Sequence, residues 1–170
     1  TCRPPGPGTM IRLMQTFMPY PDFARTAGVL DQKRLGKQRV ECIQVIRALT
    51  VPGYGWGRHP AARMWCGWLE ALGSYSLAVC EEWQGRGFSD TCAATIRADL
   101  LATGLREVRT QRELAAADEL PTWLGEEAFH RSHRSALLTK DPLFYGEVFG
   151  GEEEGQPYVW PAGRPGSVCP

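Results

Sequence analysis

Apolar residues recur every three or four positions along most of this chain, which is the spacing that places them on one face of a helix. Residues 10–20 lack that period, end in Pro-Tyr-Pro and are predicted to lie extended over the core. No stretch shows the sustained alternation of a half-buried strand. The pattern therefore predicts an all-α fold. Helices are expected at about residues 23–30, 31–49, 61–72, 73–83, 90–102, 110–119, 123–140 and 142–149.

Several of these helices are expected to begin at residues that can cap them. Asp22 and Asp31 precede the first two, and a short polar side chain there accepts a hydrogen bond from a backbone N–H further on. Serines and Gly73 are expected to separate the third helix from the fourth. The predicted organisation is a flexible arm over 1–13, one compact helical domain over 14–161 and a tail over 162–170.

The expected helix over residues 31–49 has two distinct faces. Its apolar side chains form a predicted buried stripe: Leu35, Cys42, Ile43, Ile46 and Leu49. Arg34, Lys37 and Glu41 share another face. Gly36 is costly inside a helix compared with Ala, so its presence predicts that another helix or a ligand approaches the backbone closely there.

Charge is distributed unevenly, although the formal net charge is zero. Residues 1–64 hold ten Lys or Arg and three Asp or Glu, a local charge of +7. Residues 65–170 hold nine basic and sixteen acidic residues, a local charge of −7. This asymmetry favours a molecule with one basic and one acidic face, although a charge-segregated surface without a partner would have the same composition.

Composition narrows the class of protein further. No window approaches the ~20 apolar residues that span a bilayer, and the first residues lack the apolar core of a secretory signal. We therefore expect a cytoplasmic monomer without membrane contact. None of the cysteines forms the close pairs that zinc sites use, which predicts reduced structural thiols and no metal or other cofactor. The cysteines are Cys2, Cys42, Cys66, Cys80, Cys92 and Cys169.

A basic cluster on the helix over 31–49 is suited to phosphate. Arg34, Lys37 and Arg39 bring three cations together, and Glu41 lies four residues after Lys37, so the two side chains can pair. A glycosylase with lyase activity uses such a pair, because the carboxylate stabilises a cationic sugar and the amine attacks it. Asp31 is a second carboxylate at the helix start. The alternative is a solvated face with an ordinary ion pair.

A second cluster contains His130, Arg131, His133 and Arg134. Two His and two Arg within five residues suit contacts to phosphate or substrate, or proton transfer. A metal site needs more ligands than this spacing supplies. The alternative is a surface without functional consequence.

A third candidate is the glycine-rich loop with Trp56, Arg58 and His59. An aromatic residue and an Arg on a flexible loop can stack on bases or wedge between them. The loop is equally compatible with a tight helix connection in which Trp56 is anchored in the core.

The sequence resembles phage endonuclease V and its bacterial and viral relatives, the pyrimidine-dimer DNA glycosylases with apurinic-site lyase activity. The resemblance covers about residues 14–161. It is carried by QTFMPYPDF at 15–23, LDQKRLGKQRVE at 30–41, HP at 59–60, AVCEEWQGRGF at 78–88 and the stretch 129–145.

This resemblance implies a compact all-helical fold that binds kinked double-stranded DNA and extrudes a nucleotide. In the family, the α-amine at the chain terminus attacks the sugar C1′, releases the base and leaves a Schiff base that leads to strand cleavage. An α-amine has an unperturbed pKa of about 7.7–8.0, so it holds more free base at neutral pH than Lys, near about 10.4. A carboxylate stabilises the sugar cation, and arginines hold the flanking phosphates.

The resemblance also suggests roles for particular residues. Arg34 matches one of the family's site arginines, and Lys37 lies near a second basic position. The family's carboxylate directly follows an Arg, where this chain has Leu35. Glu41 is the candidate that replaces it, with Asp31 second.

The attacking amine has two candidates. Thr1 would supply an α-amine if it is the first residue of the mature chain, and Lys37 is the alternative as an internal amine.

Together these features predict a DNA N-glycosylase, with or without apurinic-site lyase activity, that acts on a damaged or modified pyrimidine in duplex DNA without a cofactor. The predicted DNA contacts are Arg34, Arg39, Arg58, His59, His130, Arg131, His133 and Arg134. Two alternatives stay open: a non-catalytic nucleic-acid-binding module of the same fold, and an N-glycosidase for a small nucleoside.

Overall fold

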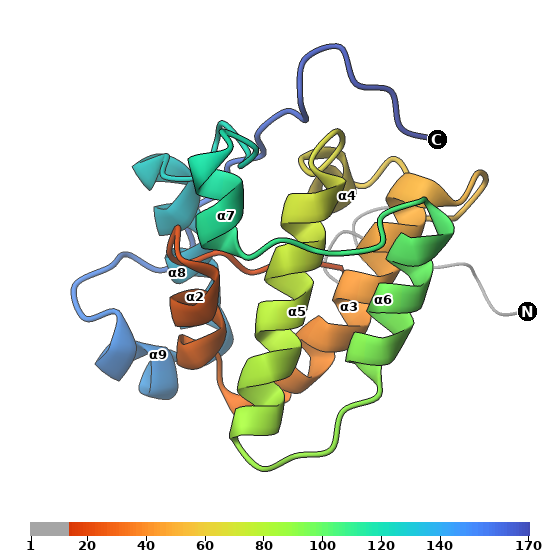
Figure 1. The fold of residues 1–170 in the computed structure, drawn as a ribbon. Coiled ribbons are helices and arrows are strands. Elements are labelled where there is room, and N and C mark those ends of the chain that lie inside the picture. The colour runs from red at the N-terminus through yellow and green to blue at the C-terminus, as the bar shows by residue number, and fades with distance from the viewer. Residues whose placement is uncertain (1–13) are drawn as a thin grey trace, which may run out of the picture.

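A computed structural model of the protein describes residues 14–170 (Figure 1). Within that range the chain forms helices and no strands, which confirms the all-α prediction. The helices are α2 (Phe23–Val29), α3 (Gln32–Thr50), α4 (Pro60–Arg63), α5 (Leu69–Gly85), α6 (Cys92–Ala102), α7 (Gln111–Ala116), α8 (Glu127–Lys140) and α9 (Pro142–Val148). The predictions that concern Thr1, Cys2 and the arm over 1–13 lie outside the described residues.

The helix starts follow local capping. The Asp22 side chain accepts from Arg25 N at the start of α2, and the Asp31 side chain accepts from Arg34 N at the start of α3. Because each cap is settled within three residues, these two starts agree with the sequence expectation.

The predicted break at Gly73 is wrong. Gly73 lies inside α5, and a Cβ there would lie 2.7 Å from Leu100 Cδ1 of α6. The glycine is therefore needed for close packing of α5 against α6. The chain breaks earlier, after the single turn of α4, where Gly67 adopts a φ of +82° that disfavours other residues.

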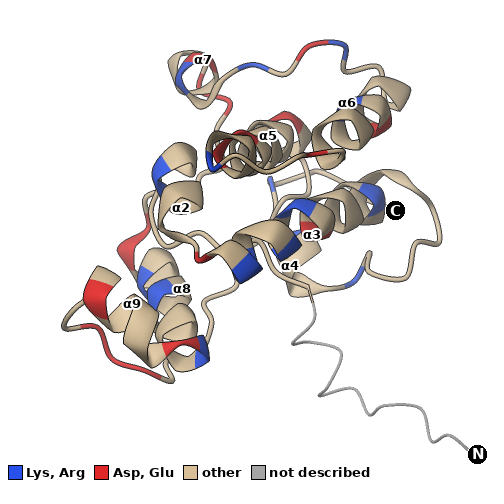
Figure 2. Cartoon of the chain, turned by 90° about the horizontal axis from the view of Figure 1, so that it is seen from below, with Lys and Arg blue, Asp and Glu red and all other residues tan. Residues whose placement is uncertain are grey.

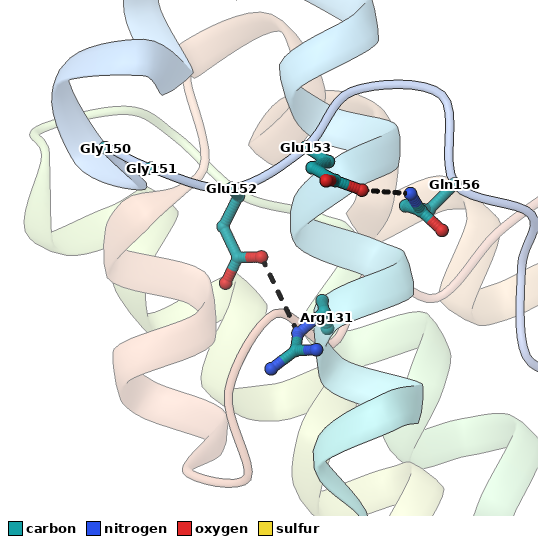
Figure 3. Close-up of a pocket in the computed structure, with 6 residues that line it drawn as sticks. All are labelled: Arg131, Gly150, Gly151, Glu152, Glu153 and Gln156. Atoms are coloured by element: carbon teal, nitrogen blue, oxygen red, sulfur yellow. Dashed lines mark hydrogen bonds and ion pairs between the residues drawn. The ribbon is translucent and has the colours of Figure 1, made fainter.

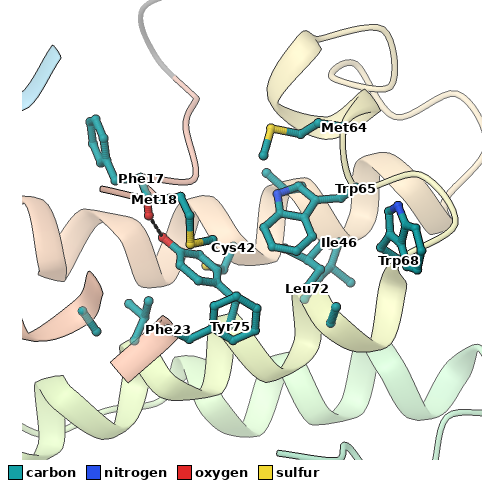
Figure 4. Packing of buried hydrophobic residues seen from close by; sticks show 14 of the residues in the cluster. Phe17, Met18, Phe23, Cys42, Ile46, Met64, Trp65, Trp68, Leu72 and Tyr75 are labelled. Atoms are coloured by element: carbon teal, nitrogen blue, oxygen red, sulfur yellow. Dashed lines mark hydrogen bonds between the residues drawn. The ribbon is translucent and has the colours of Figure 1, made fainter. Parts of the chain in front are cut away.

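The core lies where α3, α5 and α6 pack against one another and α2 packs on α5 (Figure 1). Trp65 and Tyr75 are fully buried beside Phe23, with ring centroids 5.6–6.5 Å apart (Figure 4). The ring of Trp83 from α5 would lie 3.1 Å from a Cβ at Gly36. This confirms the prediction of a close approach and identifies the neighbour as a helix.

Residues 14–20 lie extended beside α3, as predicted for that stretch, and side chains satisfy its buried backbone. Gln38 accepts from Phe17 N at 3.0 Å and donates to Gln15 O at 2.6 Å. The Tyr75 hydroxyl donates to Phe17 O at 2.6 Å (Figure 4). Since an unpaired buried backbone group is costly, these contacts fix the position of the segment.

The prediction of reduced cysteines is wrong for one pair. Cys66 and Cys169 form a disulfide across 103 residues, whereas Cys42, Cys80 and Cys92 are buried free thiols. The C-terminal tail returns to the turn between α4 and α5, where Arg164 N donates to Cys66 O at 2.7 Å. Long-range pairing of this kind leaves no signature in the local spacing of cysteines.

Aromatic residues that precede the tail also pack against the helical domain. Tyr158 lies 5.2 Å from His133 and Trp160 lies 6.2 Å from His59, measured between ring centroids. Of the helices described over residues 14–170, none is long and apolar enough to cross a bilayer.

Candidate functional site

The first half of α3, the end of α8 and two loop segments surround a cavity of about 720 Å³. Basic side chains line it together with aromatic ones and one carboxyl group. The lining residues are Met14, Gln15, Phe17, Lys33, Arg34, Lys37, Glu41, Ala136, Thr139, Lys140, Gly155, Gln156 and Tyr158. A volume of this order is the size at which proteins hold small organic ligands.

Glu41 is the buried carboxyl group of this cavity. The residue is 4% exposed, and its Oε1 lies 3.5 Å from Lys37 Nζ. The backbone N–H of Gln15 also donates to this carboxyl. Burial raises the pKa of Glu41 from 4.5 to about 7, against the lowering effect of Lys37 and Lys140. At neutral pH the group therefore exists in both protonation states, as a proton-transfer group requires.

Cations surround the mouth of the cavity. Lys33, Lys37 and Lys140 are exposed, and the Lys37 side chain is 55% accessible. Arg34 is held in place: its guanidinium pairs with Asp31 at 2.7 Å and donates to Lys140 O at 3.2 Å. Figure 2 shows Lys and Arg clustered on the first half of α3. Four positive charges around one carboxyl group suit a polyanion with phosphates on both sides of the bound group.

Asp31 does not line this cavity. It caps α3, pairs with Arg34 and accepts from the Tyr145 hydroxyl at 2.7 Å. Burial raises the pKa of Asp31, but hydrogen bonds from Arg34 and Tyr145 outweigh burial and lower it below its ordinary value. Its carboxylate is thus already saturated with donors.

His130 and His133 lie inside the protein, where they hold the backbone N–H and C=O of one residue, Met18. His133 Nδ1 accepts from Met18 N at 3.1 Å, and His130 Nδ1 lies 2.8 Å from Met18 O. Burial lowers the pKa of both rings, that of His133 to about 3. Neutral histidines with backbone partners need no phosphate to explain their spacing.

The two arginines of α8, Arg131 and Arg134, both lie close to carboxylates. Arg134 donates to Pro19 O at 2.9 Å and pairs with Glu127 and Glu152. Arg131 is more exposed and lies 3.8 Å from Glu152. The shallow pocket beside Arg131 is lined by Glu152 and Glu153 (Figure 3). That surface is more acidic than the cavity of α3.

Arg39, Arg58 and His59 lie away from the cavity. Arg39 pairs with Asp90, and its guanidinium lies 4.1 Å from the Trp83 ring centroid. His59 caps α4 by accepting from Ala61 N at 3.1 Å. Arg58 is exposed in the loop after α3, whereas the cavity lies against the first half of that helix. The structure therefore brings together Arg34, Lys37 and Glu41 from the predicted set.

Sequence reasoning missed other lining residues. Lys140 and Tyr158 come from chain positions about 100 residues beyond Glu41, and Gln15 and Phe17 belong to the extended segment. Lys33 also lines the cavity, and its position next to Arg34 in the basic stretch of α3 is the signal that could have identified it.

Within residues 14–170, no group of three or more His, Cys, Asp or Glu side chains is arranged to hold a metal ion.

Comparison with known proteins gives one positive finding. The family model described as pyrimidine dimer DNA glycosylase matches residues 14–96, which include α3 and therefore Arg34, Lys37 and Glu41. No curated protein and no solved structure matches the chain.

Proposed function

We propose that the α3 cavity excises a damaged or modified pyrimidine from duplex DNA, in line with the match of residues 14–96 to the family model described as pyrimidine dimer DNA glycosylase. One observation carries the proposal. A buried carboxyl group, Glu41, lies 3.5 Å from an amine inside a cavity rimmed by cations. Enzymes that act on a base must first take it out of the stack, and this cavity has the size and charge to accept the extruded nucleotide.

The proposed chemistry uses the amine and the carboxyl group together. The amine nitrogen attacks C1′ of the sugar, the C1′–N bond breaks, and its electron pair leaves with the base, which takes up a proton. Glu41 in its ionised form stabilises the positive charge on the sugar and takes the proton that the amine loses. The nitrogen lone pair then forms an imine with C1′ as the C1′–O4′ bond breaks, and O4′ takes up the proton held by Glu41. Loss of a proton from C2′ to a base then eliminates the 3′ phosphate, which cleaves the strand and is the proposed lyase activity.

Two nitrogen atoms of the described chain lie at Glu41. Lys37 Nζ is one, and the backbone nitrogen of Gln15 is the other. A polypeptide that began at Gln15 would present its α-amine to Glu41 instead of an amide. An amine at residue 1 is the third candidate, outside the described residues.

The deciding experiment offers the protein duplexes that contain either a cyclobutane pyrimidine dimer or an abasic site, with borohydride present to reduce a Schiff base. From the first we expect cleavage of the C1′–N bond at one pyrimidine of the dimer, whose base stays joined to its neighbour through the cyclobutane ring, so that the product is an alkali-labile abasic site. We also expect nicking of the second duplex and a covalent adduct. Glu41→Gln should lose at least about 100-fold in rate, whereas Glu81→Gln, on exposed α5 surface, should match the wild type.

The identity of the amine follows from the same adduct. Lys37→Arg keeps the positive charge but cannot form an imine, so loss of trapping in this variant would identify Lys37 as the nucleophile. Peptide mapping of an adduct that persists would locate a terminal amine.

The alternatives predict different outcomes. Salt-dependent duplex binding by the wild type without base release, nicking or adduct would mean a non-catalytic binding module. Absence of affinity for any duplex would leave a small-nucleoside N-glycosidase. Either result would overturn the proposal.

A further inference from the structure

Two large apolar side chains stand exposed at the start of α9. Leu143 is 88% exposed and Phe144, its neighbour, is 42% exposed. The other exposed large apolar residues of the described chain occur singly, which is ordinary for a protein surface. An adjacent pair on a short helix is a feature that needs an explanation.

The pair is presented rigidly. Pro142 occupies the first turn of α9, and the Asp141 carboxylate accepts from Phe144 N at 3.1 Å. Tyr145 is fully buried below the pair, stacks on Phe149 at 5.5 Å and donates its hydroxyl to Asp31 at 2.7 Å. These contacts fix α9 against the first residues of α3.

The same contacts place the pair beside the basic mouth of the cavity. Arg34 lies 5.7 Å from the Tyr145 ring and donates to the backbone of Lys140, so two lining cations belong to the unit that carries the pair. Asp141 uses its carboxylate to cap α9, whereas Glu147, one turn after Leu143, is an exposed acid. The lining cations Arg34 and Lys140 therefore lie close to the start of α9, which carries the pair.

We infer that Leu143 and Phe144 form a wedge that enters the base stack of the duplex next to the nucleotide held in the cavity. This inference rests on the proposed function. An extruded nucleotide leaves a gap in the stack, and apolar side chains of this type unstack neighbouring bases and kink the duplex. Cations beside the wedge hold the phosphates on either side of the gap. Duplex DNA is thus the partner that fits both features, because its bases match the apolar pair Leu143 and Phe144 and its phosphates match the nearby cations.

The experiment compares Leu143→Ala and Phe144→Ala, singly and combined, with Leu101→Ala, an exposed residue of α6 that is 54% accessible. The first probe is a duplex with an abasic-site analogue and 2-aminopurine as the adjacent base, because its fluorescence rises when the base loses its stacking partner. Wild type and Leu101→Ala should raise the fluorescence on binding, and the double variant should not.

The second probe is cleavage of the C1′–N bond in a single turnover, measured as alkali-labile strand breaks at a cyclobutane dimer that is either fully paired or opposite a bulge that is already unstacked. We expect the double variant to be at least about tenfold slower on the paired duplex, since unstacking costs a few kcal/mol per step, and equal to wild type on the bulged one. Equal loss on both duplexes would mean general damage to the site and would overturn the wedge.

The two proposals fail differently. If the wild type cleaves the C1′–N bond and the variants behave as it does on both probes, the wedge is wrong and the proposed function stands. If the wild type leaves that bond intact but raises the fluorescence through Leu143 and Phe144, the wedge stands without the chemistry. A change of oligomeric state in the variants, measured by light scattering, would identify the pair as a self-association surface and overturn the inference.

Discussion

Two polar clusters contact the extended segment 14–20, one from α3 and one from α8, and both combine basic side chains with a group suited to proton transfer. The side chains of the α8 cluster bind the backbone of the segment: His130 and His133 contact Met18, and Arg134 donates to Pro19 O. The α3 cluster keeps Lys37 largely exposed and Glu41 buried, with a cavity between them and the solvent.

The difference concerns how far each cluster is satisfied. Protein groups meet both ring nitrogens of His130, Nδ1 of His133 and the guanidinium of Arg134, whereas His133 Nε2 is buried without a hydrogen-bond partner. A ligand would therefore find few unpaired polar groups on α8. Glu41 instead has a carboxyl group whose ionised form is disfavoured by burial, which raises its pKa to about 7. A perturbed carboxyl group at a cavity is a better mark of function than the residue types in either cluster.

The largest expected contrast lies in stability. At pH 8 Glu41→Gln should stabilise the protein by roughly 3 kcal/mol, because it removes a buried charge whose cost is set by the raised pKa. His133→Ala should destabilise it by about 3 kcal/mol, since it leaves Met18 N unpaired and opens a void.

Urea unfolding followed by circular dichroism measures both. Arg131→Ala, on an exposed part of the same helix as His133, should change little. If Glu41→Gln destabilised the protein as much as His133→Ala, the Glu41 carboxyl group would have a structural role. The proposed difference between the two clusters would then be wrong.

The two clusters should also differ in how stability depends on pH, because Glu41 and His133 contribute with opposite signs. The raised pKa of Glu41, 4.5 to about 7, means that its stabilising contribution is complete below pH 4.5 and is lost as pH rises through 7. The lowered pKa of His133, 6.5 to about 3, means that its contribution is complete above pH 6.5 and is lost as pH falls through 3.

Between pH 4.5 and 6.5 these two effects oppose each other. Stability of Glu41→Gln relative to wild type should therefore increase with pH across the window from 4.5 to 7, whereas His133→Ala should gain relative to wild type as pH falls from 6.5. Unfolding curves at a series of pH values give both differences. Parallel curves for wild type and Glu41→Gln would show that Glu41 titrates normally.

The smallest expected effect is on the salt dependence of DNA binding. Lys33→Gln removes an exposed cation of the cavity rim and should reduce the slope of log K against log salt by about 0.9. Arg131→Gln should leave the slope unchanged, because Glu127 and Glu152 already surround Arg131. Fluorescence anisotropy with one duplex at several salt concentrations compares them. A larger change for Arg131 would locate the DNA on α8.

Local interactions account for what could be predicted from the sequence. The caps Asp22 and Asp31 are settled within a single turn, so the starts of α2 and α3 follow from the sequence. The pairing of Lys37 with Glu41 is likewise a contact between residues four apart on one helix. These features depend only on contacts between residues a few positions apart.

Long-range contacts account for the failures. Gly73 reads as a helix break until Leu100 of α6 is known to pack on it, and the Cys66–Cys169 disulfide joins residues 103 apart. His133 reads as a surface residue until Met18 is placed beside it. In each case the deciding neighbour lies in a distant part of the chain, so the pattern around the residue carries no information about it.

The side chains that contact segment 14–20 are synthesised at different times, so the two ends of the segment acquire their partners in a fixed order. His130 and His133 are made 112 and 115 residues after Met18, and a nascent chain leaves the ribosome with its N-terminal part first. The contact of Gln15 with Glu41 needs only α3, but the far end of the segment stays open until α8 has emerged. Met18 and Pro19 therefore lack their α8 partners for most of translation, when a chaperone can bind this end of the segment.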